Sequence, residues 1–112
     1  MNSKNYCDYI VFDVLAEIPG IASRAMFGGF GIYKDGKIFA IIVDDELYFK
    51  VDDSNRSDFE NFGSHPFTYG KKDGKSATMS YWLVPEEIVE DRERLYELVG
   101  KSIMIKQTRV SD

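Results

Sequence analysis

Cysteine and histidine are almost absent from this sequence, which has one of each among 112 residues. A single cysteine cannot form an internal disulfide, and this usage fits the reducing environment of a cytoplasm. Cys7 and His65 are also too few to make a zinc site or a Cys/His catalytic centre. We therefore expect a cytoplasmic protein that carries neither a metal nor a cofactor.

The sequence also lacks a long apolar run and an excess of basic residues. No stretch approaches the roughly 18 apolar residues of a membrane-spanning helix, so we expect no membrane partner. The first residues, "MNSKNYCDYI", do not show the basic and then apolar segments of a secretory signal. Nineteen acidic residues against fourteen basic ones give a net charge of −5. Because clustered Lys and Arg drive nucleic-acid binding, direct DNA binding is the least favoured function.

The apolar content is sufficient for one stable domain. Apolar residues make up 44% of the chain and include eight Phe, seven Tyr and one Trp. A chain of this length forms one domain, which we expect over residues 1–112 with a frayed polar tail from about residue 107.

The spacing of the apolar residues changes along the chain from a helical to a strand-like period. It predicts a helix, three strands, a short helix, two strands and a last helix. This order is an α+β fold with one antiparallel sheet of about five strands. The predicted segments are residues 4–18, 31–43, 47–52, 57–63 and 66–84, with the last helix beginning at Pro85.

Acidic residues and glycines mark the predicted hairpin turns. Asp-Gly pairs supply a positive φ at little cost, so Asp35-Gly36 and Asp73-Gly74 predict two tight turns. A third turn is predicted at Asp44–Glu46, where a strand-like run ends and another begins. The first two strand runs and the two runs after residue 66 are therefore expected to form hairpins.

Capping residues give the limits of the short and the last helix. Ser57 and Glu60 have the spacing of a capping box, which predicts the start of the short helix. Gly63 is expected at its C-terminal cap. Pro85 is expected at the start of the last helix, where its missing N–H costs little.

The strand "IFAIIV" at residues 38–43 is apolar on both faces. Simple alternation puts Ile38, Ala40 and Ile42 on one face and Phe39, Ile41 and Val43 on the other. Two long helices can cover one face of the sheet, which would leave the second face exposed. We therefore expect a homodimer built through the sheet, unless the short helix and the tyrosines close this face within one chain.

The glycines of "RAMFGGFGIYKDGK" raise the possibility of a phosphate-binding loop. A dinucleotide-binding glycine motif follows a strand and opens a helix, whereas this stretch follows a helix and leads into strands. No G-K-[ST] of a P-loop is present. We interpret the glycines as a bulge or a close backbone approach inside the sheet, with a ligand-binding loop as the alternative.

A family resemblance is carried by the stretches "RAMFGGFGIYKDGKIFAIIVDDELYFKVD", "FGSHPFTYG" and "MSYWLVPEEIVED". From about Tyr9 to Ser102, the chain resembles the N-terminal domain of the TfoX (Sxy) family of competence regulators. The resemblance implies a fold like that of type III secretion chaperones and no known catalysis. In full-length members a helical domain follows, and the regulator promotes transcription of DNA-uptake genes alongside the cAMP receptor protein. The structural residues of the motif are Met26, Phe27, Gly28, Gly29 and Gly31, and Gly36 completes the hairpin turn.

Five polar-tipped residues in the matched motifs are the candidate binding residues. They are Arg24, Tyr48, Lys50, Tyr69 and Tyr81. All are expected in strands or at strand edges, so several of them can share one face of the sheet. They form either a ligand or partner surface or a polar layer within the fold.

The sequence supports two classes of function. The leading hypothesis is a non-enzymatic regulatory module that contacts a protein partner, because no catalytic constellation is present. The alternative is a binding protein or enzyme for an anionic small molecule, which would use the cluster around Arg24 and Lys50.

Overall fold

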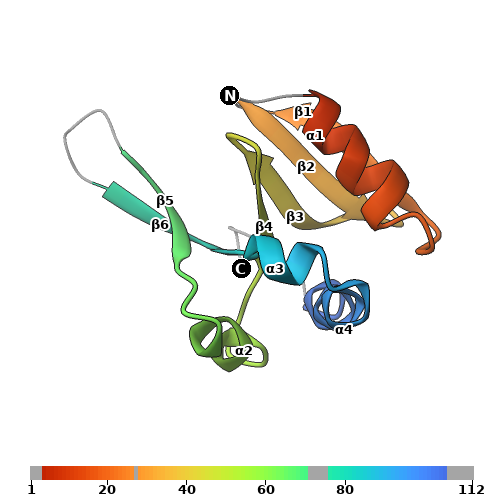
Figure 1. Ribbon diagram of the computed structural model, residues 1–112. Coiled ribbons are helices and arrows are strands. Elements are labelled where there is room, and N and C mark those ends of the chain that lie inside the picture. Colours follow the sequence, from red (N-terminus) through yellow and green to blue (C-terminus); the bar gives the residue numbers. More distant parts are fainter. Residues whose placement is uncertain (1–3, 27, 71–75, 106–112) are drawn as a thin grey trace.

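The computed structural model describes residues 4–26, 28–70 and 76–105, which form one sheet with helices packed against it (Figure 1). The six strands lie in the order β1-β2-β3-β4-β6-β5, and every neighbouring pair is antiparallel. The α+β fold with one antiparallel sheet is confirmed. The elements are α1 (Lys4–Tyr9), the π-helix η1 (Ile10–Val14), β1 (Ile21–Met26), β2 (Gly29–Lys34), β3 (Lys37–Val43), β4 (Glu46–Lys50), α2 (Arg56–Asn61), β5 (Pro66–Gly70), β6 (Ser76–Leu83), α3 (Glu86–Val89) and α4 (Arg92–Ile103).

The sheet has one strand more than the sequence predicts. The additional strand is β1, whose sequence "IASRAM" leaves five of its six residues exposed. Such a strand has no alternation of apolar and polar residues, so it carries little periodic signal. Gly28, at φ +70°, lies between β1 and β2, so the glycine stretch begins at the connection between these two strands.

Both long helices differ from the predicted ones. The first ends at Val14 rather than near residue 18, and its last residues widen into the π-helix η1. The last helix is divided into α3 and α4. Asp91 starts α4, because its side chain accepts a hydrogen bond from the N–H of Arg94 at 3.3 Å. No helix in the described ranges is long and apolar enough to cross a membrane.

The predicted capping box of the short helix is wrong. Helix α2 begins at Arg56, so Ser57 lies inside its first turn and makes no cap. The preceding residue, Asn55, is fully buried and accepts a hydrogen bond from the N–H of Asp52 at 2.8 Å. Gly63 follows the helix at φ +74°, as expected for a residue at the C-terminal cap.

Two of the predicted turns are confirmed by the backbone. Asp35 and Gly36 have φ values of 50° and 85°, and they connect β2 to β3 through the pair Lys34–Lys37. Asp44 and Asp45, at φ 51° and 59°, connect β3 to β4 in the same way. The turn predicted at Asp73-Gly74 lies outside the described residues.

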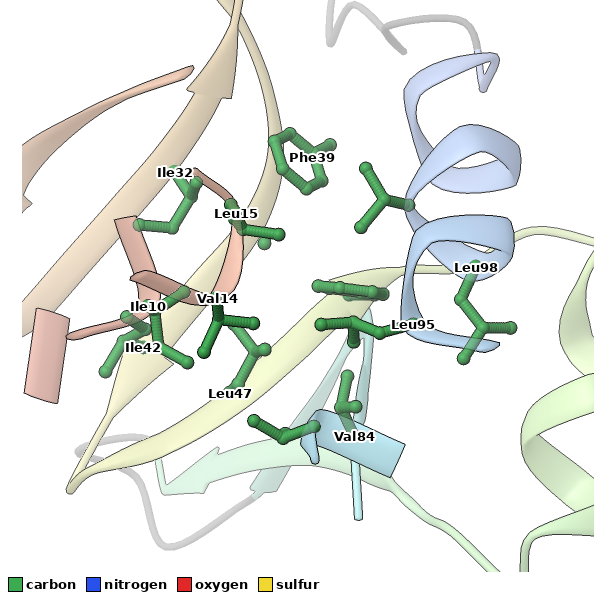
Figure 2. Close-up of a cluster of buried hydrophobic side chains, with 14 of the residues drawn as sticks. Ile10, Val14, Leu15, Ile32, Phe39, Ile42, Leu47, Val84, Leu95 and Leu98 are labelled. Atoms are coloured by element: carbon green, nitrogen blue, oxygen red, sulfur yellow. The ribbon is translucent and has the colours of Figure 1, made fainter. Parts of the chain in front are cut away.

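The main core lies between the sheet and the helices. Figure 2 shows Ile10 and Val14 of η1, and Leu15 directly after it, against strand residues that include Ile32 and Ile42. Leu95 and Leu98 extend the same cluster from α4, and Phe59 of α2 joins it. In the described part of the chain, every buried hydrophobic residue of a helix belongs to this cluster. The helices therefore cover one face of the sheet.

A bulge in β3 changes which residues face the helices. Ile32 pairs with Ala40 and Tyr33 pairs with Ile38, so Phe39 is an extra residue without its own partner on β2. Phe39, Ala40 and Ile42 consequently lie in the main core, and Ile38, Ile41 and Val43 lie on the opposite face. The assignment by simple alternation is therefore wrong for Ile38 and Phe39.

The second face of β3 is largely covered by strand residues of the same chain. Ile41 is 6% exposed and packs with Tyr48 and Tyr81. The apolar character of β3 is thus accounted for without a second copy. The homodimer stays a prediction, and a single-chain mass that does not change with concentration in sedimentation equilibrium would contradict it.

Two glycines without side-chain neighbours are predicted to respond to alanine in opposite directions. Gly36 sits at φ +85°, so Gly36→Ala is expected to destabilise the fold by about 1 kcal/mol through backbone strain alone. Gly100 lies inside α4 with open space around it, so Gly100→Ala is expected to stabilise by about 0.5–1 kcal/mol. Urea unfolding measures both changes. A Gly36→Ala midpoint at or above that of the wild type would contradict the turn assignment.

Candidate functional site

The face of the sheet opposite the helices is built from strands only, and we call it the strand face. In β4, Leu47 and Phe49 point to the helix-side core, so Tyr48 and Lys50 point to the strand face. Lys50 pairs with Tyr81 across β4 and β6. Three of the five candidate residues thus lie together. The strand face consists of Arg24, Met26, Tyr33, Ile38, Ile41, Val43, Tyr48, Lys50, Phe67, Tyr81 and Leu83.

Tyr48 lies near the centre of the strand face and is buried. Its ring meets that of Phe67 edge-on, with centroids 5.2 Å apart, and its hydroxyl donates a hydrogen bond to Glu46 Oε1 at 3.1 Å. Burial, followed by the hydrogen bond to Glu46, raises the pKa of Tyr48 to about 12. Burial also raises the pKa of Tyr81. Both phenols therefore keep their protons at physiological pH and pack as neutral side chains.

Lys50 is a partly buried cation in this apolar setting. Burial lowers its pKa, and the nearby positive charge of Lys37 lowers it further. Among the described residues, no carboxylate lies within 4.0 Å of either ammonium group. Lys50 also lines a cavity of about 530 Å³, together with Ser80 and Met104. An anionic group at this position would offset the repulsion between the two lysines.

Arg24 lies on the same face but at the far edge of the sheet. It is exposed on β1, separated from β4 by two strands, and its guanidinium lies 5.8 Å from the ring centroid of Tyr33. This contact is a cation–π interaction and not an ion pair. Tyr33 and Lys37 belong to the surroundings of the candidate cluster, although they were not among the candidate residues. Tyr69 is in β5 opposite Ala77, and its side chain lies outside the described residues.

The glycines of the motif allow the strands and side chains to pack closely. A Cβ at Gly29 would collide with the carbonyl oxygen of Ile42 on β3. A Cβ at Gly31 would lie 2.8 Å from Met26 Sδ and 3.0 Å from Ile38 Cδ1, so this glycine makes room for both side chains on the strand face. Close approach inside the sheet thus accounts for these two residues. Phe27 lies outside the described residues.

The remaining candidates for chemistry have structural roles. Cys7 is 1% exposed in the main core, and burial raises the pKa of its thiol. His65 is exposed in the loop before β5, where Nδ1 lies 3.2 Å from the carbonyl oxygen of Pro66. Within the described ranges, no three His, Cys, Asp or Glu side chains are grouped so that they could hold a metal ion.

One buried polar residue was not recognised from the sequence. Asn55 Nδ2 donates hydrogen bonds to the carbonyl oxygen of Lys50 at 3.1 Å and to Ser102 Oγ at 3.5 Å. Ser102 Oγ donates to the same carbonyl at 2.8 Å. These bonds connect the end of β4 to α2 and α4, and thereby hold Lys50 at a fixed position. Asn55 ends the polar stretch "DDSN", which is typical of an exposed loop, so the sequence does not indicate that this residue is buried.

Comparison with known proteins identifies the relatives of this fold. Residues 13–105 match the TfoX N-terminal domain. The chain belongs to the TfoX N-terminal domain family. The family resemblance expected from the glycine and tyrosine motifs is therefore confirmed, and the match includes every strand.

Two curated proteins are similar to this TfoX N-terminal domain. Protein Sxy of Escherichia coli (strain K12) is 30% identical over 94 residues, which are 81% of this chain and 43% of that protein. DNA transformation protein TfoX1 of Aliivibrio fischeri (strain ATCC 700601 / ES114) is 26% identical over 92 residues, 82% of this chain and 44% of that protein. The chain thus spans less than half the length of these relatives.

The raised pKa of Tyr48 predicts a loss of stability at alkaline pH. The folded chain holds the phenol proton to about pH 12, whereas the ordinary pKa is 10.0. The stabilisation from the neutral phenol is therefore complete below pH 10 and is lost as the pH rises toward 12. Tyr48→Phe has no proton to lose, so its free energy of unfolding should fall less steeply over this range. Urea unfolding at about pH 9 and about pH 11.5 tests this, and parallel pH dependences would contradict it.

Proposed function

We propose that this chain is a non-enzymatic interaction module of a regulator of DNA transformation, and that it acts in the cytoplasm through a protein partner. The observation that carries the proposal is the division of the sheet into a helix-covered face and a strand face. Around a buried centre at Ile41, the strand face carries partly exposed apolar side chains such as Met26, and among the described residues no carboxylate lies within 4.0 Å of Lys50 or Arg24. A mixture of apolar surface and charge is typical of partner-binding surfaces.

The family supports the same direction. One relative is named for DNA transformation, and it is more than twice as long as the part that this chain matches. Within the described part of the chain, the titratable residues with shifted pKa values are phenols, a buried thiol, Lys50 and Asp52. Asp52 is held by its own loop, since Ser54 Oγ donates to its carboxylate at 2.5 Å. This distribution favours recognition over catalysis.

A second function is favoured by the surroundings of Lys50. The cavity of about 530 Å³ has a size that small ligands occupy, and Lys37 and Lys50 would both be stabilised by an anion. The alternative is therefore an anionic small molecule bound beside Lys50. It places the ligand at the end of β4, beside Met104 and Ile105, and leaves Arg24 without a role.

The experiment compares partner capture by two charge reversals of equal size. Lys50→Glu changes the strand face, whereas Arg92→Glu changes an exposed position on α4 that forms only a 3.5 Å ion pair with Asp13. We expect Lys50→Glu to lower the amount of the captured partner at least fivefold, and Arg92→Glu to leave it within twofold. Quantitative mass spectrometry of proteins captured from a native lysate of a transformable bacterium measures both.

Two outcomes would contradict the proposal. Equal capture by the two variants would remove the strand face from the interaction. A rise in melting temperature with citrate, phosphate or nucleotides in the wild type, absent in Lys50→Glu and without partner capture, would favour the small-molecule alternative.

A further inference from the structure

The two edges of the sheet differ in how well they are protected. The outer strand β5 begins with Pro66, which has no N–H to donate, and its pairing with β6 shifts register between Pro66 and Thr68. Both features hinder the addition of another strand. The opposite edge, β1, contains neither a proline nor a lysine and pairs with β2 in unbroken register from Ile21 to Met26.

The backbone of β1 presents a regular set of free groups. The N–H of Asp35 donates to the carbonyl of Gly20 at 3.0 Å, so these two residues form a hydrogen-bonded pair. Bonded and non-bonded pairs alternate in an antiparallel ladder, so Ala22 and Arg24 bond to β2 and the residues between them do not. The N–H and C=O groups of Ile21, Ser23 and Ala25 therefore point away from the sheet. In the described part of the chain, no other element bonds to them.

The side chains of β1 define what an added strand would meet. Ser23 points to the helix side, where its hydroxyl contacts Cys7, so Arg24 points to the strand face. A residue facing Arg24 would belong to a non-bonded pair, in which opposing side chains are closest. Positions two residues to either side would face Ala22 and Met26, and Met26 is 36% exposed.

We propose that β1 is a docking edge for an extended segment of a partner protein, with an acidic residue facing Arg24 and apolar residues two positions to either side. This inference rests on the proposed function, because it specifies how the partner is held. The alternating donors and acceptors of the edge match those of a polypeptide strand. Arg24 has no carboxylate within 4.0 Å among the described residues, so the acidic residue completes an ion pair.

Charge favours an acidic peptide segment at this edge over nucleic acid and over a second copy of the chain. Nucleic acid is disfavoured because outward carbonyl oxygens and a net charge of −5 both repel phosphates. A second copy of the chain would pair about Ser23, the middle of the three outward residues. This arrangement places the two Arg24 side chains diagonally on one face, about 7–8 Å apart, where they repel each other.

Peptide display with the whole chain as bait tests the edge. A library of random nonapeptides is selected against the wild type, and the enriched peptides are measured by fluorescence anisotropy. We expect enrichment of Asp or Glu flanked two residues away by apolar side chains. Arg24→Glu should weaken these peptides at least tenfold and should itself select peptides with Lys or Arg at the central position.

A proline substitution separates the backbone from the side chain. Ala25→Pro removes one outward N–H without touching the ladder to β2, and edge strands tolerate such a proline. We expect it to weaken binding at least tenfold, whereas the matched control Ala25→Val keeps the N–H and should stay within twofold. Circular dichroism establishes that both variants are folded, and Arg24→Glu tests the edge independently if Ala25→Pro is not.

Three results of these experiments would overturn this inference. The selection could enrich no peptide, the enriched peptides could lack a preference for Asp or Glu, or the peptides could still bind Ala25→Pro as tightly as the wild type. A dimer that dissociates on Ala25→Pro would show that a second copy occupies the edge. Partner capture that depends on Lys50 while no peptide binds β1 would leave the proposed function standing and only this inference wrong.

Discussion

The fold depends on the need to cover both faces of the apolar strand β3. Its helix side is buried by α1, η1 and α4, whose buried apolar residues all belong to one cluster. Its other side carries Ile41, which is closed by the rings of Tyr48 and Tyr81. Aromatic rings with a polar tip can cover an apolar residue and still face water at their hydroxyl groups. This solution leaves a strand face that is packed at its centre and polar at its rim.

The same constraint determines which side chains each face of the sheet presents. The helices use their apolar residues on one face, so α1 and α4 present mainly polar residues outward. Among the described residues, the strand face and the adjoining β1 edge carry cations without a carboxylate within 4.0 Å and backbone groups to which no other element bonds. Asn55 and Ser102 strengthen this arrangement, because their hydrogen bonds to the carbonyl of Lys50 fix the end of β4.

Much of the fold was predictable, and two of the errors concern how strands pair. The turns at Asp35-Gly36 and Asp44–Glu46 depend on local backbone preferences, so the residues alone indicated them correctly. The strand β1 was missed because its small, exposed residues produce no periodic pattern. The two faces of β3 were partly exchanged because the bulge at Phe39 arises from pairing with β2. Pairing between segments is not encoded in the period of either one.

The sequence by itself determined the α+β class, the single antiparallel sheet and the family, because these follow from composition, local turn chemistry and motif residues. Of the candidate site, it indicated that several of five residues could share a face, since alternation within a strand is a local property, and in the structure Tyr48, Lys50 and Tyr81 do so. Only the tertiary structure decided that all helices pack on one side and that Lys37 lies near Lys50. It also decided that β1 is an edge strand of the sheet. Each of these depends on which segments become neighbours, and that choice is made by packing the whole chain at once.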